Sequence, residues 1–331
     1  MRKLLGWSLF LFGFLLLTQF VNGRSQLAAF WLMAGGLAAV VGRAWTLPVW
    51  LLGWVFLIGL APGIQQGTVG CEAPALLAYS PFNLITERDL STLGIDFFYA
   101  GSARVKAAVA PVYDEMGGRG DYSQMTHAIA YSANDLLGLG PTPGQAFYYR
   151  PLGSPRKQLL FLHGAMGNLQ CYASYWQTFA EKHHYSVICP GFGFGFWQRP
   201  GGMETAAAAT RGEPGLVIGL SNGAAGAVRL TIAHPELVDQ LVLISPVLEP
   251  ELVGSPEFAQ ALKKPPLILE GTEDRNVSPE SVERGVQAMR QAGIKPVYQL
   301  LVGHDHFLMF TARDQVYQAI LKLPSDRYRS P

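Results

Sequence analysis

The chain has 331 residues, of which 49% are hydrophobic and 15% charged, and its formal net charge is +1. This near-neutral balance, with no stripe of basic residues and interleaved aromatics, argues against a nucleic-acid partner. The three cysteines, Cys71, Cys171 and Cys189, do not suggest a disulfide framework or a metal site.

The apolar excess is concentrated in residues 1–62, where three runs cover 4–21, 27–41 and 45–61 and Arg24 and Arg43 mark the breaks. As helices, runs of this length extend roughly 22–27 Å, slightly less than the ~30 Å hydrocarbon core of a bilayer. Tryptophans within and between these runs are typical of membrane interfaces. We therefore expect three transmembrane helices that act as a membrane anchor.

Two other interpretations of this segment remain open. The first run could be a secretory signal peptide with a basic start at Arg2 and Lys3. Alternatively, the second and third runs could be re-entrant. Because Arg2, Lys3 and Arg43 are expected on the cytoplasmic side, the three-span and signal-peptide models both place the C-terminal domain outside the cytoplasm. The expected localisation is a multi-pass membrane protein with an extracytoplasmic domain.

Residues 63–145 carry the weakest pattern. Their first part is rich in glycine and proline, which favours an exit linker, and residues 103–113 are compatible with a helix. We expect a linker and an extension that precedes the sheet.

From residue 146 onward, short apolar runs alternate with helical patterns. Strands are expected at 158–162, 186–189, 216–220, 241–244, 267–270 and 297–302, and helices at 170–182, 224–234, 279–291 and 312–321. Such alternation predicts an α/β fold whose mainly parallel sheet is covered by helices on both faces. In such folds ligands bind beyond the carboxyl ends of the strands.

Residues 219–223 read Gly-Leu-Ser-Asn-Gly, between an expected strand and an expected helix. A sharp turn of this kind exposes the hydroxyl of its serine, here Ser221, as a nucleophile. A serine nucleophile needs a base, and the base needs an orienting acid. Asp274 and His306 each follow a later strand, in the loops Gly-Thr-Glu-Asp-Arg-Asn-Val and Gly-His-Asp-His-Phe.

With the turn Leu-His-Gly-Ala-Met-Gly at 162–167, these motifs make residues 146–323 resemble the α/β-hydrolase superfamily. The resemblance implies a catalytic triad of Ser221, Asp274 and His306. It also implies an oxyanion hole made by the backbone N–H groups of Ala165 and Asn222.

Each assignment has an alternative. His304 could replace His306 as the base, while Glu273, or one of Glu249 and Glu251 after the preceding strand, could replace Asp274 as the acid. The resemblance gives His163 a bracing role in its turn rather than a role in proton transfer.

Residues 190–197 read Pro-Gly-Phe-Gly-Phe-Gly-Phe-Trp and follow a strand, near the expected site. Their aromatic rings could hold an acyl chain or touch a bilayer, or they could pack inside the domain. We expect Met166, Phe192 and Phe194 to bind substrate.

The resulting hypothesis is a membrane-anchored serine hydrolase of the esterase or lipase type, with no metal or organic cofactor. An acyltransferase, an amidase and a non-catalytic, membrane-tethered binding protein remain alternatives. The expected partners are a small-molecule or lipid ester and the lipid bilayer, and no obligate protein partner is evident.

Overall fold

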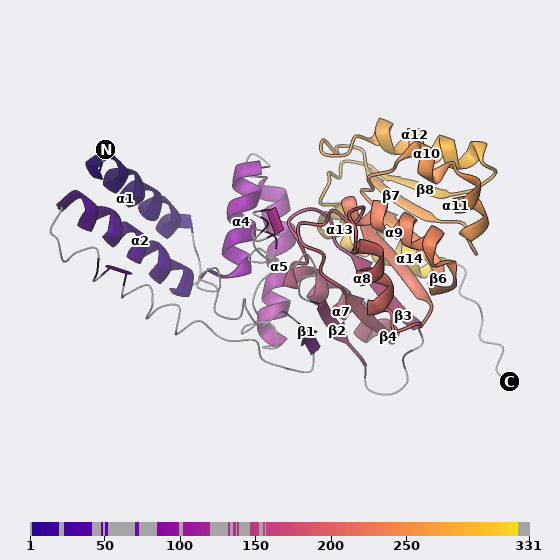
Figure 1. Ribbon diagram of the computed structural model, residues 1–331, viewed down its shortest axis with the longest axis horizontal. Helices are drawn as coiled ribbons and strands as arrows, with labels where there is room; N and C mark the ends of the chain where they lie inside the picture. Colours follow the sequence, from indigo (N-terminus) through magenta and orange to yellow (C-terminus); the bar gives the residue numbers. More distant parts are fainter. Residues whose placement is uncertain are drawn as a thin grey trace.

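The computed structural model describes residues 2–19, 23–41, 48, 50–51, 70–72, 85–98, 102–119, 132, 135–136, 138, 146–151, 155 and 157–323 (Figure 1). The first two apolar runs form helices α1 (Arg2–Gln19) and α2 (Gly23–Val41), which lie side by side. Across the described residues, no helix combines the length and the apolar character that a membrane crossing requires. Nearly all of the third run, 45–61, falls outside the described residues. The membrane anchor therefore stays a prediction.

Helices α4 (Glu87–Phe98) and α5 (Ala103–Arg119) come from the segment with the weakest sequence pattern. Only the first part of α5 was expected from the sequence, and α4 was not predicted. Leu93 of α4 packs against the contact between α1 and α2, and α5 packs on α7 (Gln170–His183) and α13 (Leu308–Thr311). These two helices therefore lie between the N-terminal helices and the sheet (Figure 1).

Eight described strands form one sheet in the order β1-β2-β4-β3-β5-β6-β7-β8. The bounds are β1 (Gly70–Glu72), β2 (Ala146–Tyr149), β3 (Lys157–Leu162), β4 (Tyr185–Cys189), β5 (Gly215–Leu220), β6 (Val238–Ile244), β7 (Leu267–Gly271) and β8 (Val297–Leu301). Strand β2 runs antiparallel to β1 and β4, and the other pairs are parallel. The mainly parallel sheet is as predicted. It also takes in β1, which lies in the segment expected to be a linker.

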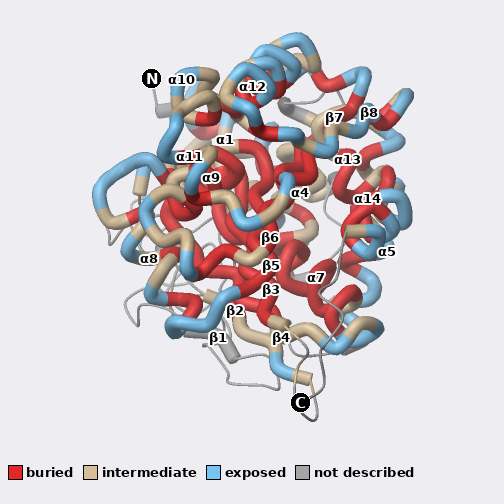
Figure 2. Tube along the Cα trace, turned by 90° about the vertical axis from the view of Figure 1, so that its right-hand side faces the viewer, coloured by how far each residue is buried: buried red, intermediate tan, exposed pale blue. Residues whose placement is uncertain are grey.

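Alternate residues of the central strands enter two separate cores, one on each face of the sheet. Phe161 and Ile218 face a core shared with α5, α7, α13 and α14 (Arg313–Leu321). Leu160 and Val217 face the other core. This second core is closed by α8 (Gly202–Ala209), α9 (Asn222–Ala233), α10 (Pro250–Val253), α11 (Pro256–Ala261) and α12 (Pro279–Gln291). Figure 2 shows the strands β3, β5 and β6 buried at the centre. This rigid layer fixes the loops that leave its carboxyl edge.

Candidate active site

Ser221 lies in the turn between β5 and α9. Its backbone has φ 53° and ψ −118°, a strained conformation for a residue that carries a side chain. The N–H of Ser221 donates to the carbonyl of Ile244 at 3.0 Å, which ties the turn to β6. A Cβ atom on Gly223 would lie 2.0 Å from a carbonyl oxygen of β3, and one on Gly219 would lie 2.5 Å from the Cα of Ala224. The turn is therefore compatible only with glycine at both positions.

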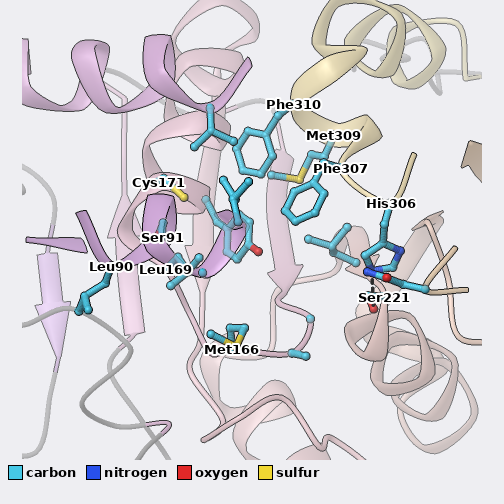
Figure 3. A pocket seen from close by; sticks show the side chains of 18 of the residues that line it. Leu90, Ser91, Met166, Leu169, Cys171, Ser221, His306, Phe307, Met309 and Phe310 are labelled. Carbon is cyan, nitrogen blue, oxygen red and sulfur yellow. Dashed lines mark hydrogen bonds between the residues drawn. The ribbon is translucent and has the colours of Figure 1, made fainter. Parts of the chain in front are cut away.

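Loops from two later strands bring a histidine and an aspartate to this serine. The Nε2 atom of His306 lies 3.1 Å from the Oγ of Ser221, and its Nδ1 atom lies 2.6 Å from the Oδ2 of Asp274. The other carboxylate oxygen of Asp274 accepts the N–H groups of Asn276 at 2.8 Å and Val277 at 2.9 Å. Figure 3 shows the His306 ring over Ser221.

The protonation states of this chain follow from its contacts. Burial raises the pKa of Asp274, but the hydrogen bond and electrostatic interaction with His306 and the two backbone N–H groups outweigh burial and lower it overall. Asp274 is then ionised at neutral pH and can only accept hydrogen bonds. The Nδ1 atom of His306 must therefore carry a proton, which leaves the lone pair of Nε2 for the hydroxyl proton of Ser221.

The alternative residues take other partners. The Nδ1 atom of His304 lies 3.0 Å from a guanidinium nitrogen of Arg104 and 2.9 Å from the hydroxyl of Thr311. Glu273 is exposed, and Glu249 forms an ion pair with the arginine of α9 at 2.8 Å. None of these three side chains contacts His306 or Ser221 in the hydrogen bonds of the described chain.

His163 braces the turn after β3. Its Nε2 atom accepts the N–H of Phe192 at 3.1 Å, so its Nδ1–H donates to the carbonyl of Gly164 at 2.8 Å. Burial lowers the pKa of His163 to about 4, and the imidazole is therefore neutral at physiological pH. Both nitrogens of this neutral, fully enclosed ring are hydrogen-bonded to backbone groups. The ring therefore braces the loop and is not available to exchange a proton with a substrate.

The two expected oxyanion-hole residues adjoin Ser221. Ala165 lines the same cavity as Ser221, and the preceding Gly164 is so close that a Cβ there would lie 3.0 Å from the Cβ of Ser221. Asn222 is the first residue of α9, where a backbone N–H has no partner within the helix. Both residues thus have backbone close to Ser221.

A cavity of about 430 Å³ opens beside Ser221 and His306. This volume is within the usual range for small-molecule sites. Most of its walls are apolar. The lining comprises Leu90, Ser91, Gly94, Ile95, Val109, Tyr113, Gly164, Ala165, Met166, Leu169, Cys171, Tyr172, Phe194, Leu220, Ser221, Asn276, His306, Phe307, Met309 and Phe310. The first six belong to α4 and α5, and sequence reasoning missed all of them. The only signal was a set of α4 positions, 90, 91, 94 and 95, spaced to share one helix face.

The aromatic loop after β4 divides into two parts. Phe194 lines the cavity, as does Met166, and the N–H of Phe194 donates to Asp135 at 3.0 Å. Phe192 differs from its expected role. It is 1% exposed, lies outside the cavity lining and stacks on Trp197 with ring centroids 5.4 Å apart. The cause is the bracing by His163, which draws Phe192 inward through its backbone N–H.

No family model and no curated protein matches the sequence. Solved structures with partial similarity include an alpha-beta serine hydrolase homologue from Coxiella burnetii, 17% identical over 56% of this chain and 94% of that one, with a TM-score of 0.41. An S-formylglutathione hydrolase from Agrobacterium tumefaciens is 14% identical over 54% and 90%, with a TM-score of 0.42. Esterase PE8 is 18% identical over 54% and 97%, with a TM-score of 0.43.

At these levels of similarity the neighbours indicate neither substrate nor reaction. The fold is defined by the molecule's own features: a mainly parallel sheet between two helical layers, a strained serine turn after β5, and loops after β7 and β8. The order serine, aspartate, histidine along the chain is that of α/β-hydrolases. The chain therefore has an α/β-hydrolase-like fold.

Proposed function

We propose that this protein is a serine hydrolase that cleaves carboxylic esters. The observation that carries the proposal is the hydrogen-bond chain from Ser221 through His306 to Asp274, at 3.1 and 2.6 Å, at one end of an apolar cavity. A serine nucleophile, a base and an orienting acid in contact are what acyl transfer requires.

In the acylation step, His306 takes the hydroxyl proton at Nε2 while the Oγ of Ser221 attacks the ester carbonyl. Asp274 holds the imidazole in the required tautomer and stabilises the imidazolium that forms. The N–H groups of Ala165 and Asn222 would receive the negative charge on the carbonyl oxygen. A donor of this kind contributes about 2.7–4 kcal/mol to the transition state in a comparable enzyme.

Collapse of the tetrahedral intermediate releases the alcohol, which takes the proton from His306. Water then attacks the acyl-enzyme, with His306 again as base, and the acid leaves. Transfer to an alcohol would use the same residues with a different acceptor, and amide cleavage would differ in the leaving group. The apolar cavity favours an ester whose acyl part is a hydrocarbon chain.

A fluorophosphonate probe tests the nucleophile. We expect labelling of the purified wild type and none of Ser221→Ala, while Ser281→Ala on helix α12, outside the cavity lining, should label normally. Absence of wild-type labelling would favour a non-catalytic binding protein. Labelling that survives Ser221→Ala would assign the reaction to another serine. A chain-length series of p-nitrophenyl esters then separates an esterase from a lipase.

We also propose that the N-terminal segment attaches the protein to a membrane, with the hydrolase domain outside the cytoplasm. Large apolar side chains of α1 and α2 that are exposed support this, among them Leu4 (74%), Leu11 (62%) and Phe14 (53%). Cell fractionation tests the attachment, and a reporter enzyme fused to the C-terminus tests the side. Recovery of the full chain in the soluble fraction would refute the attachment.

A further inference from the structure

The cavity has a polar end that the proposed reaction does not use. Figure 3 shows Ser91 and Cys171 on the side away from Ser221 and His306, with Phe307 and Met309 between. Ser91 and Cys171 both line the cavity, as does Tyr113 of α5. Hydroxyl and thiol groups at the end of an apolar cavity are positioned to contact a polar atom of a ligand.

Behind these groups lies Glu87, a carboxylate that is 3% exposed. Its Oε2 atom accepts the N–H of Gln170 at 2.7 Å, and its Oε1 atom accepts the N–H of Cys171 at 3.0 Å and the hydroxyl of Tyr113 at 3.1 Å. The carboxylate therefore sits at the N-terminus of α7, where a helix favours negative charge. Burial raises the pKa of Glu87 to about 7, so above this pH the carboxylate is ionised and all three contacts require it to accept.

These contacts fix the direction of the hydroxyl protons. Tyr113 has a single hydroxyl proton, and it points to Glu87. The Oγ of Ser91 lies 2.7 Å from the oxygen of Tyr113, so Ser91 must be the donor in that pair. The Oγ of Ser91 is left with lone pairs and no proton to offer. The thiol of Cys171 stays protonated, because burial, and then the charge of Glu87, raise its pKa.

We infer that Ser91 accepts a hydrogen bond from a hydroxyl group on the acyl chain, so that the cavity prefers hydroxyacyl esters to unsubstituted ones. The inference rests on the proposed ester hydrolysis, and it names the substrate class of the same site. A ketone or ester oxygen at this end would find no strong donor among the described residues. An ammonium group would lose most of its hydration in the surrounding apolar walls, a far larger cost than for a hydroxyl.

The test compares kcat/KM for p-nitrophenyl esters of three kinds of acid: unsubstituted, ω-hydroxy, and keto at the penultimate carbon. The acyl chains range from hexanoyl to dodecanoyl, and the assay is run at pH 8. At the best-fitting length, we expect the wild type to favour the hydroxy ester about two- to tenfold, the contribution of one hydrogen bond. In Ser91→Ala the unsubstituted ester should be favoured over the hydroxy ester, because the hydroxyl of the bound hydroxy ester is then buried without a hydrogen-bond partner. Thr92→Ala is the matched control, since in the part of the chain that the structure describes Thr92 bonds only within its own helix and does not line the cavity.

A third variant checks the direction of the protons. Tyr113→Phe removes the acceptor for the Ser91 proton, so Ser91 becomes able to donate and the keto ester should gain relative to the wild type. A wild type with no preference for the hydroxy ester at any length, or a preference that survives Ser91→Ala, would overturn the inference.

Binding to the Ser221→Ala variant separates this inference from the proposed function. Calorimetry with free ω-hydroxy and unsubstituted acids needs no turnover. If no ester is cleaved but the hydroxy acid binds more tightly and Ser91→Ala abolishes the difference, the recognition stands and the reaction fails. If esters are cleaved without discrimination, the reaction stands and the recognition fails.

Discussion

Replacement of Asp274 by asparagine perturbs one proton in the proposed site and leaves its shape unchanged. The N–H groups of Asn276 and Val277 donate to the Oδ1 position at 2.8 and 2.9 Å, so an oxygen must stay there. The new amide nitrogen is then forced to the Oδ2 position, 2.6 Å from the Nδ1 atom of His306. Because an amide nitrogen only donates, Nδ1 must accept and the ring proton moves to Nε2.

With a proton on Nε2, His306 can no longer accept the hydroxyl proton of Ser221. We expect kcat for p-nitrophenyl ester hydrolysis to fall about ten-thousand-fold, the loss that the same exchange causes in a serine protease triad. This corresponds to about 5 kcal/mol of transition-state free energy. Steady-state kinetics measures the loss, and circular dichroism with thermal unfolding establishes that the variant remains folded.

The matched control is Glu273→Gln, at the exposed neighbouring carboxylate, which should keep nearly all of the activity. A folded Asp274→Asn variant with more than about a tenth of the wild-type kcat would refute the reasoning, because the tautomer would then not govern the rate. Loss of activity in Glu273→Gln alone would assign the orienting acid to Glu273.

Two further predictions concern stability. Burial raises the pKa of Glu87 from 4.5 to about 7, so its contribution to folding is present below pH 4.5 and is lost as pH rises through 7. Between these pH values the free energy of unfolding of the wild type should therefore fall by roughly 3 kcal/mol relative to that of Glu87→Gln, with Tyr113 and Cys171 neutral throughout. Urea titrations at pH 5 and pH 8 measure this change, and an equal change in the wild type and in Glu87→Gln would contradict the prediction. Gly223→Ala should cost about 3 kcal/mol or more, since its Cβ would lie 2.0 Å from backbone, whereas Gly94→Ala, with no atom within 4 Å, should be neutral or stabilising in the same denaturation assay.

The part of the fold that could be predicted is the part encoded by local pattern. Buried parallel strands are continuous apolar runs, so the predicted strand at 216–220 coincides with β5 within one residue. The loops that carry Asp274 and His306 directly follow such strands, and the carboxyl edge of the sheet brings them together with Ser221. For these residues, position along the chain was sufficient to predict position in space.

The cavity wall could not be predicted, because it depends on contacts between residues far apart in the sequence and not on a local pattern. Helix α4 contains a glycine and begins with charged residues. No local pattern marks Glu87 as buried, because the backbone N–H groups that it accepts are 83 and 84 residues away. Phe192 was misplaced because alternation with glycine does not reveal which ring turns inward. The bracing contact from His163 decides this, and it is a tertiary contact.

The origin of the cavity in two separate parts of the chain has a consequence for engineering. The three residues of the proposed triad lie in loops that follow strands of the sheet, whereas Ser91 and Tyr113 belong to α4 and α5, which precede β2 in the sequence. The proposed chemistry and the proposed choice of acyl chain therefore lie on different segments of the chain, which meet where α5 packs on α7 and α13. A library confined to the cavity-lining positions 90, 91, 94, 95 and 109 would sample new ester preferences without changing any residue of the proposed triad.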